Sequence, residues 1–228
     1  VRLPVERIVG RVETECELRF VVVDGAQAFC HVPADLGRGY CDLFLAGCHK
    51  WLGAYLPLGV GFYGRVRSRQ VIDAEAARML ATGELDDPLL RFTTQLEGGR
   101  LDGTTETVSL AALFTTHATA ADPALSGNGF EGLLRSRVLN VRAVASVAPS
   151  SGWHPVGLNE SLGSGILLLR EGGRNAIVAD AASVRARFHE AGVALTAYDD
   201  GTVRLAMPAE PLDAKALGRL EQAFRLAA

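Results

Sequence analysis

Three short apolar runs in the first third of the chain constrain its fold more than any other feature. They cover residues 20–23, 41–47 and 59–64. Runs of this length without polar alternation are typical of strands buried on both faces, as in a parallel sheet. Apolar residues at helical spacing precede them at residues 4–12 and follow them at residues 73–82. This alternation predicts part of an α/β layer.

The pattern changes after the segment 149–152, which contains Pro and Gly. We predict part of a mostly parallel α/β domain over residues 1–125, a linking helix over 126–150 and a small α+β domain over 151–228. In the first domain, residues 82–100 are expected to be irregular and residues 104–121 helical. In the last, turn and cap signals predict four strands, at 166–169, 176–178, 193–198 and 202–206, and two helices, at 180–192 and 212–226.

Charge and composition exclude several classes of function. The 228 residues carry 23 Lys and Arg against 26 Asp and Glu, so no basic excess points to nucleic acid. No apolar run reaches the roughly 18 residues of a membrane span, and no signal peptide is visible. The four cysteines include no CxxC pair, and the histidines have no ligand spacing. We therefore expect a cytoplasmic protein with reduced cysteines, no metal site, and no nucleic-acid or membrane partner.

Two residues that can carry chemistry follow the first two predicted strands. Asp24 lies where the first strand ends, and Lys50 lies just after the second. The carboxyl ends of parallel strands meet at one edge of a sheet, so a carboxylate and an amine should converge there. The chain has only one other lysine, Lys215, in a polar helix turn. Because a desolvated lysine can lose its proton and attack a carbonyl, we expect Lys50 to be a Schiff-base residue rather than a solvated charge.

The sequence around these residues resembles the class V aminotransferases, which are fold-type I pyridoxal-phosphate enzymes and include cysteine desulfurases. The resemblance rests on residues 21–28 (VVVDGAQA), 41–52 (CDLFLAGCHKWL) and 59–63 (GVGFY), and it extends weakly over the rest of the chain. It implies pyridoxal 5′-phosphate as cofactor, an amino acid or amine as substrate and transamination as the default outcome. It also implies a homodimer.

The resemblance assigns cofactor-binding roles to four residues near the two strand ends. Lys50 would hold the cofactor as a Schiff base and then carry a proton to and from the substrate. Asp24 would pair with the pyridinium nitrogen, although an Asp in this position can also simply cap a turn. Gln27 would lie near the phenolic oxygen of the ring, and His49 would lie near the phosphate.

Two further roles fall later in the chain. Thr104 would reach the phosphate in the neighbouring subunit, and it could equally cap the helix that follows it. Arg204 would bind the substrate carboxylate with its planar pair of donors, the alternative being an ordinary surface residue of a strand.

Some positions depart from the family pattern. Gly47 and Cys48 stand where the family has a small hydroxyl residue beside the phosphate, and we expect Cys48 to be a buried thiol. No cysteine follows Cys48, which disfavours desulfurase chemistry. The resemblance also implies about as many residues again upstream of the chain, carrying a phosphate cradle. Two alternatives stay open: a lyase or epimerase of the same fold, and a non-catalytic family member that serves as a subunit or binding module.

Overall fold

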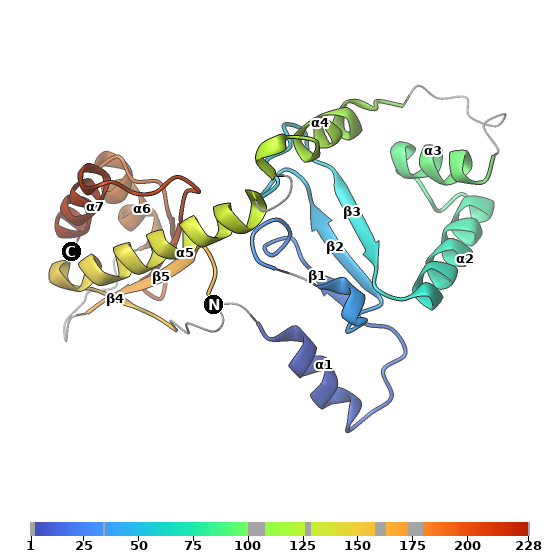
Figure 1. Ribbon diagram of the computed structural model, residues 1–228, viewed down its shortest axis with the longest axis horizontal. Coiled ribbons are helices and arrows are strands. Elements are labelled where there is room, and N and C mark those ends of the chain that lie inside the picture. The colour runs from blue at the N-terminus through green and yellow to red at the C-terminus, as the bar shows by residue number, and fades with distance from the viewer. Residues whose placement is uncertain are drawn as a thin grey trace. The chain divides into compact units, whose positions relative to one another are not determined.

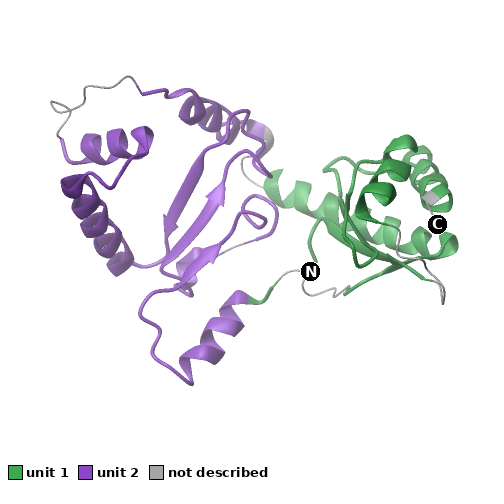
Figure 2. Ribbon diagram, turned by 180° about the vertical axis from the view of Figure 1, so that it is seen from behind, with its two compact units in different colours: residues 1–4, 126–228 green, residues 5–125 purple. Residues whose placement is uncertain are grey.

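The computed structural model describes residues 3–33, 35–99, 108–125, 129–157, 163–172 and 180–227. It divides into two compact units, one of residues 5–125 and one of residues 126–228 with the first four residues (Figure 2). In chain order the helices and strands of the first unit are α1 (Val5–Glu13), β1 (Val22–Asp24), β2 (Leu43–Gly47), β3 (Gly59–Tyr63), α2 (Val66–Thr82), α3 (Pro88–Glu97) and α4 (Ala111–Ala120) (Figure 1). Those of the second are α5 (Gly129–Val147), β4 (Trp153–Pro155), β5 (Ile166–Glu171), α6 (Ala181–Glu190), β6 (Thr196–Ala197), β7 (Thr202–Ala206) and α7 (Ala214–Ala227).

The first unit contains a three-stranded sheet in the order β1-β2-β3. β1 and β2 are parallel, with Asp24 opposite Leu45, as the apolar runs predict. β3 runs antiparallel to β2, so the third run is not a parallel strand. One face of the sheet carries the core of Cys41, Phe44 and Ala46. The prediction of burial on both faces is wrong for the described chain, because side chains of the opposite face, such as Val22 and Leu45, are exposed.

Two helices of this unit differ from the sequence prediction. α2 begins at Val66 rather than at residue 73. Residues 88–97, expected to be irregular, form α3, because Asp87 accepts a hydrogen bond from the Leu90 amide and Pro88 occupies the first helical turn. This Asp-Pro pair is a helix start and not a break.

The second unit packs α5, α6 and α7 with an antiparallel sheet in the order β4-β5-β7-β6. Fourteen buried residues form its core, centred on the mutually packed rings of Trp153, Phe188 and Phe224. The helix expected to link two domains is α5, and it contributes Val141 and Val144 to this core. The predicted strand at 176–178 lies outside the described residues.

Strand β4 is not among the predicted strands, whereas local signals explain why β5, α6, β7 and α7 form close to their predicted positions. Asp180 accepts hydrogen bonds from the amides of Ala182 and Ser183 and thereby caps α6. Gly192 ends the same helical segment with φ of 77°, a left-handed conformation that glycine adopts without strain. Asp200 and Gly201 form the turn between β6 and β7.

Candidate cofactor and substrate site

Asp24 ends β1, and its carboxylate holds the turn that follows. Asp24 Oδ1 accepts a hydrogen bond of 2.9 Å from the Ala26 amide. The neighbouring Gly25 is buried, and a Cβ at that position would overlap the ring of Phe44 in β2. Only glycine therefore lets the chain turn this closely over the sheet. Asp24 Oδ2 has no hydrogen-bond partner among the described residues, and the side chains of Asp24 and Gln27 are both exposed.

His49 and Lys50 lie in the corresponding turn after β2. The Cys48 amide donates to Leu58 O, and the Ala54 amide donates to Cys48 O, so the segment forms a closed loop at the end of the strand. The His49 ring folds back over Gly47, where an added Cβ would lie 3.0 Å from the ring. Glycine at position 47 therefore leaves room for this ring in place of a hydroxyl side chain.

A stacked pair of rings joins the two turns. His31, at the end of the turn that contains Gln27, is buried and stacks on Trp51, which follows Lys50 directly, with ring centroids 3.6 Å apart. The parallel register of β1 and β2 and this stack place Asp24, Gln27, His49 and Lys50 at one edge of the sheet. The two turns therefore lie at the same end of the parallel strands, while the meeting of the Asp24 and Lys50 side chains stays a prediction.

The expected burial of Lys50 is wrong for the described chain. The side chain of Lys50 is exposed, as is that of His49, and no described residue forms an ion pair or a hydrogen bond with the Lys50 amine. Lys50 projects from a loop beyond the end of β2, and no described element covers it. Desolvation of this amine is therefore not supplied by the described residues and cannot serve as an argument for its reactivity.

Cys48 occupies the position expected for a buried thiol. Its side chain is 1% exposed. Burial raises the pKa of the Cys48 thiol above its usual value, while the hydroxyl of Thr116 in α4 acts in the opposite direction and only partly offsets this. A thiol in this state is not a nucleophile at neutral pH. None of the four cysteines forms a disulfide bond.

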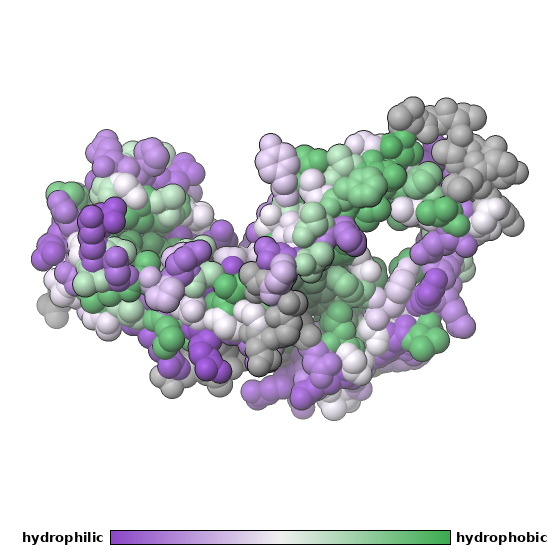
Figure 3. All heavy atoms as spheres, turned by 45° about the horizontal axis from the view of Figure 1, so that its top comes forward, coloured by the Kyte–Doolittle hydropathy of each residue, from purple (hydrophilic) through white to green (hydrophobic). Residues whose placement is uncertain are grey.

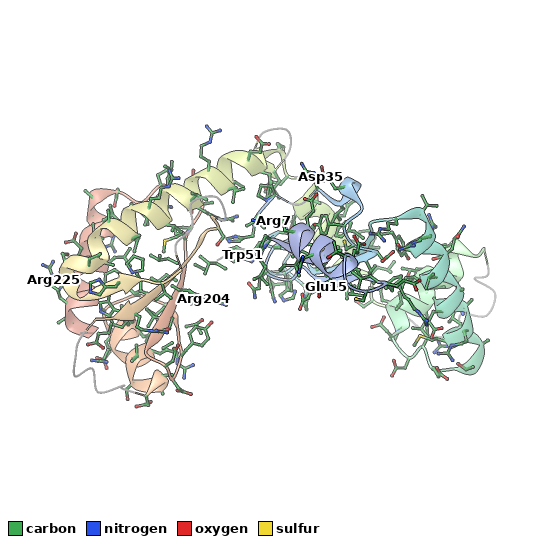
Figure 4. All side chains as sticks on the ribbon, turned by 90° about the horizontal axis from the view of Figure 1, so that it is seen from below. Arg7, Glu15, Asp35, Trp51, Arg204 and Arg225 are labelled. Carbon is green, nitrogen blue, oxygen red and sulfur yellow. The ribbon has the colours of Figure 1, made fainter. Side chains whose placement is uncertain are left out.

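Of the two predicted site residues later in the chain, the structure describes Arg204 but not Thr104. Thr104 lies outside the described residues, and the helix predicted from residue 104 begins at Ala111, after the non-helical residues 108–110. Arg204 lies at the middle of β7 in the second unit, where it projects from the sheet with its side chain partly buried (Figure 4). Its guanidinium has no ion-pair partner among the described residues, so its two donors are available to a carboxylate.

Comparison with known proteins identifies the family. The family model for class V aminotransferases matches residues 1–115, which is just over half of the chain. The chain therefore belongs to the class V aminotransferase family. No curated protein matches the sequence.

Solved structures share the fold at low sequence identity. Pyridoxamine–pyruvate aminotransferase from Mesorhizobium loti is 19% identical to this chain, with a TM-score of 0.68 over 98% of this chain and 56% of its own. Phosphoserine aminotransferase from Cytophaga hutchinsonii is 16% identical with a TM-score of 0.63, over 97% of this chain and 58% of its own. Alanine–glyoxylate aminotransferase from Nostoc sp. is 14% identical with a TM-score of 0.64, over 98% and 57%. The chain thus spans a little over half the length of these relatives, and the likeness shows the fold.

The residues at the sheet edge suit one part of pyridoxal phosphate, the cofactor that the family implies. A carboxylate with one free oxygen (Asp24), an amide (Gln27) and a primary amine without a described partner (Lys50) are the groups that a pyridinium ring, its phenolic oxygen and its aldehyde require. His49 adds a donor for the phosphate. These residues fit the ring and the aldehyde.

Sequence reasoning missed the groups that hold this edge in shape. Gly25, the His31–Trp51 stack and Thr116 beside Cys48 all act through contacts between segments distant in the chain. Of these only Gly25 had a local signal, because glycine directly after a strand often marks a close approach of two backbones. No group of three or more potential metal ligands occurs among the residues described, and no described helix is long and apolar enough to span a membrane.

Proposed function

We propose that this chain is part of a pyridoxal-phosphate enzyme that acts on an amino acid or amine, with transamination as the default reaction. The observation that carries the proposal is the placement of Lys50, one of only two lysines, at the same sheet edge as Asp24. The family match over residues 1–115 supports the class of enzyme. The relatives named above are all aminotransferases, which supports transamination over elimination or epimerisation.

Each residue at the edge has a distinct task in this proposal. Pyridoxal phosphate, when bound, supplies a ring that stabilises negative charge at the substrate α-carbon. Lys50 holds the cofactor covalently and afterwards accepts and returns a proton at that carbon. The Asp24 carboxylate keeps a proton on the pyridinium nitrogen. Gln27 donates to the phenolic oxygen, while His49 and Thr104 contact phosphate oxygens, Thr104 in a neighbouring subunit.

Arg204 is proposed to bind the carboxylate of the substrate. The guanidinium projects from the centre of the small sheet and lacks a described ion-pair partner. A partly buried guanidinium with free donors suits a planar anion.

We also propose a homodimer, supported by the apolar side chains exposed on the first unit (Figure 3). We propose a reducing, cytoplasmic location, which is compatible with four cysteines that form no disulfide bond.

The test is reduction of the full chain with borohydride after addition of pyridoxal 5′-phosphate, followed by peptide mass spectrometry. Reduction makes a lysine-bound cofactor permanent, so the modified residue can be read directly. The matched variants are Lys50→Arg and Lys215→Arg, because both lysines are exposed and each removes one amine. We expect modification at Lys50 that Lys50→Arg abolishes and Lys215→Arg leaves unchanged. Equal modification of both lysines would refute a specific site.

A second candidate is a non-catalytic family member that acts as a subunit or binding module. The exposure of both Lys50 and Asp24 favours it, because an active amine is normally desolvated. The same borohydride experiment separates the two candidates. A binding module would show no preference for Lys50 over Lys215, whereas the enzyme would.

A further inference from the structure

The face of the small sheet that carries Arg204 has a defined pattern of side chains. Val203 and Leu205 of β7 point into the core, so Arg204 and Thr202 lie on the opposite face. Arg204 is directly opposite Leu168 of β5 on one side and Thr196 of β6 on the other. Its immediate cross-strand neighbours therefore carry no charge.

A second arginine lies on the same face, one step along the sheet. Arg170 of β5 is opposite Thr202, which makes it the diagonal neighbour of Arg204, at a typical separation of about 7–8 Å. Unlike Arg204, Arg170 has polar partners on two of its three nitrogens. Its Nη2 lies 2.9 Å from Asp200 Oδ2, and its Nε and Nη2 donate to Thr202 Oγ1 at 3.2 and 3.0 Å.

The turn between β6 and β7 fixes this arrangement. Asp200 Oδ1 accepts a hydrogen bond of 3.0 Å from the Thr202 amide, so the carboxylate is anchored to the backbone with its second oxygen directed at Arg170. The pKa of Asp200 is lowered, mainly by hydrogen bonds from Thr202 and to a smaller extent by the positive charge of Arg170. The carboxylate is therefore ionised at neutral pH.

We propose that Asp200 is a specificity-determining residue: by neutralising Arg170 it leaves Arg204 as a single carboxylate site, so that the chain prefers a substrate with one carboxylate over one with two. The proposal rests on the function proposed above for Arg204. A dicarboxylate would bring its second negative charge toward Arg170, where the Asp200 carboxylate already pairs with Nη2 and repels that charge. With Leu168 beside Arg204, the favoured substrate is a small amino acid with an uncharged side chain.

The test compares propionate and succinate as probes of the full chain, read from the side-chain Nε–H resonances of the arginines in ¹⁵N-labelled protein. The variant is Asp200→Asn, because asparagine retains the oxygen that accepts from the Thr202 amide and removes only the charge. In the unaltered protein we expect both probes to shift the Arg204 resonance, with succinate binding more weakly than propionate. In Asp200→Asn we expect succinate to bind about fivefold more tightly, as one exposed ion pair would give, with propionate unchanged.

Two further variants complete the design. Arg170→Gln combined with Asp200→Asn should remove the gain for succinate, because the second cation is then absent. Arg204→Gln should remove the response to both probes. If Asp200→Asn leaves the succinate-to-propionate ratio unchanged while Arg204 responds to both, the role of Asp200 is overturned and the proposed function stands. If the Arg204 resonance responds to neither probe, both this inference and the carboxylate-binding role of Arg204 are overturned.

Discussion

The two compact units of the chain bury their apolar side chains very differently. Among the described residues, the unit of residues 126–228 has a core cluster of fourteen buried residues, whereas the main cluster under the three-stranded sheet has three. Conversely, twelve large apolar side chains of residues 5–125 are exposed, against four in the other unit. The second unit therefore has a core sufficient to hold it together, while the first leaves a substantial part of its apolar surface without cover.

This difference bears on function because the proposed cofactor residues lie in the unit with the smaller core. The edge with Asp24 and Lys50 is shaped by a few local devices, chiefly Gly25 over Phe44 and the His31–Trp51 stack. The desolvation that a reactive amine needs must come from groups that cover this unit. Exposed apolar surface of this extent is typical of faces that contact other protein surfaces. The reactivity of the Lys50 amine therefore depends on which protein surface covers the first unit.

The largest expected effects come from truncating one aromatic ring in each core. Phe188→Ala and Phe44→Ala should each cost about 3–5 kcal/mol of unfolding free energy. Phe188 leaves thirteen other buried residues in its cluster, so its unit should still unfold cooperatively at lower urea. Phe44 leaves only Cys41 and Ala46, so the first unit should lose its fixed packing even without urea.

The measurement uses the two tryptophans, Trp51 in the first unit and Trp153 in the second. Labelled with 5-fluorotryptophan, they give one ¹⁹F resonance for each unit in the intact chain. Phe114→Ala is the control, because Phe114 is 67% exposed and its loss should cost less than about 0.5 kcal/mol in the free chain. Equal shifts of both midpoints in Phe44→Ala and Phe188→Ala would contradict the difference in core size.

Asp42 supplies a second, smaller effect and makes the first unit sensitive to acid. Its side chain is 1% exposed and accepts hydrogen bonds of 2.9 Å from the Val21 amide and the Ser68 hydroxyl, with Arg65 and Arg67 nearby. Burial alone would raise the pKa of Asp42, but these donors and cations together outweigh it and lower the pKa below its usual value. Asp42→Asn should cost about 2 kcal/mol at pH 7, since the bonds are to a charged group.

The sign of the pH dependence follows from this lowered pKa. The unfolded chain takes up a proton at Asp42 near pH 3.9, before the folded chain does. The stabilisation by Asp42 is therefore present above that pH and is lost as the pH falls through the lower pKa of the folded state. Urea unfolding followed at the Trp51 resonance should show the gap between wild type and Asp42→Asn closing in acid. A gap that stays constant from pH 7 to pH 2.5 would show that the charge of Asp42 is not its source.

Helix caps allow the two units to be compared at matched chemistry. Asp87 caps α3 and Asp180 caps α6, each by accepting backbone amide hydrogen bonds. Replacement by alanine should cost about 1 kcal/mol at either site. Because α6 buries Val184 and Phe188 while α3 buries no residue, Asp180→Ala should lower the stability of its whole unit, and Asp87→Ala should only fray α3. Amide hydrogen exchange separates the two outcomes, and global loss of protection in Asp87→Ala would argue against this distinction.

The same contrast explains how much of the fold the sequence predicts. Apart from β4, the described strands, caps and turns of the second unit follow from local signals, such as Asp180 at a helix start and Gly201 in a hairpin turn. The placement of the turns with Asp24 and Lys50 at one edge follows from a rule for parallel strands. The direction of β3 does not, because pairing with β2 is a long-range choice that a run of five residues does not encode. The exposure of Lys50 also does not, because burial depends on what covers the strand ends.

The smallest expected effect is a gain in stability at Cys30, in the turn that carries Gln27. Cys30 has φ of 54°, the left-handed region that side chains other than glycine adopt at a cost of roughly 1–2 kcal/mol. Cys30→Gly removes this cost but adds about 0.5–1 kcal/mol of chain entropy in the unfolded state, so we expect a net gain of about 0.5–1 kcal/mol. Cys16→Gly is the control, because Cys16 is exposed and lacks a positive φ, and the same change there should not stabilise. A higher urea midpoint at the Trp51 resonance for Cys30→Gly alone would show that the turn at the proposed cofactor edge is strained, whereas equal losses in both variants would show that it is not.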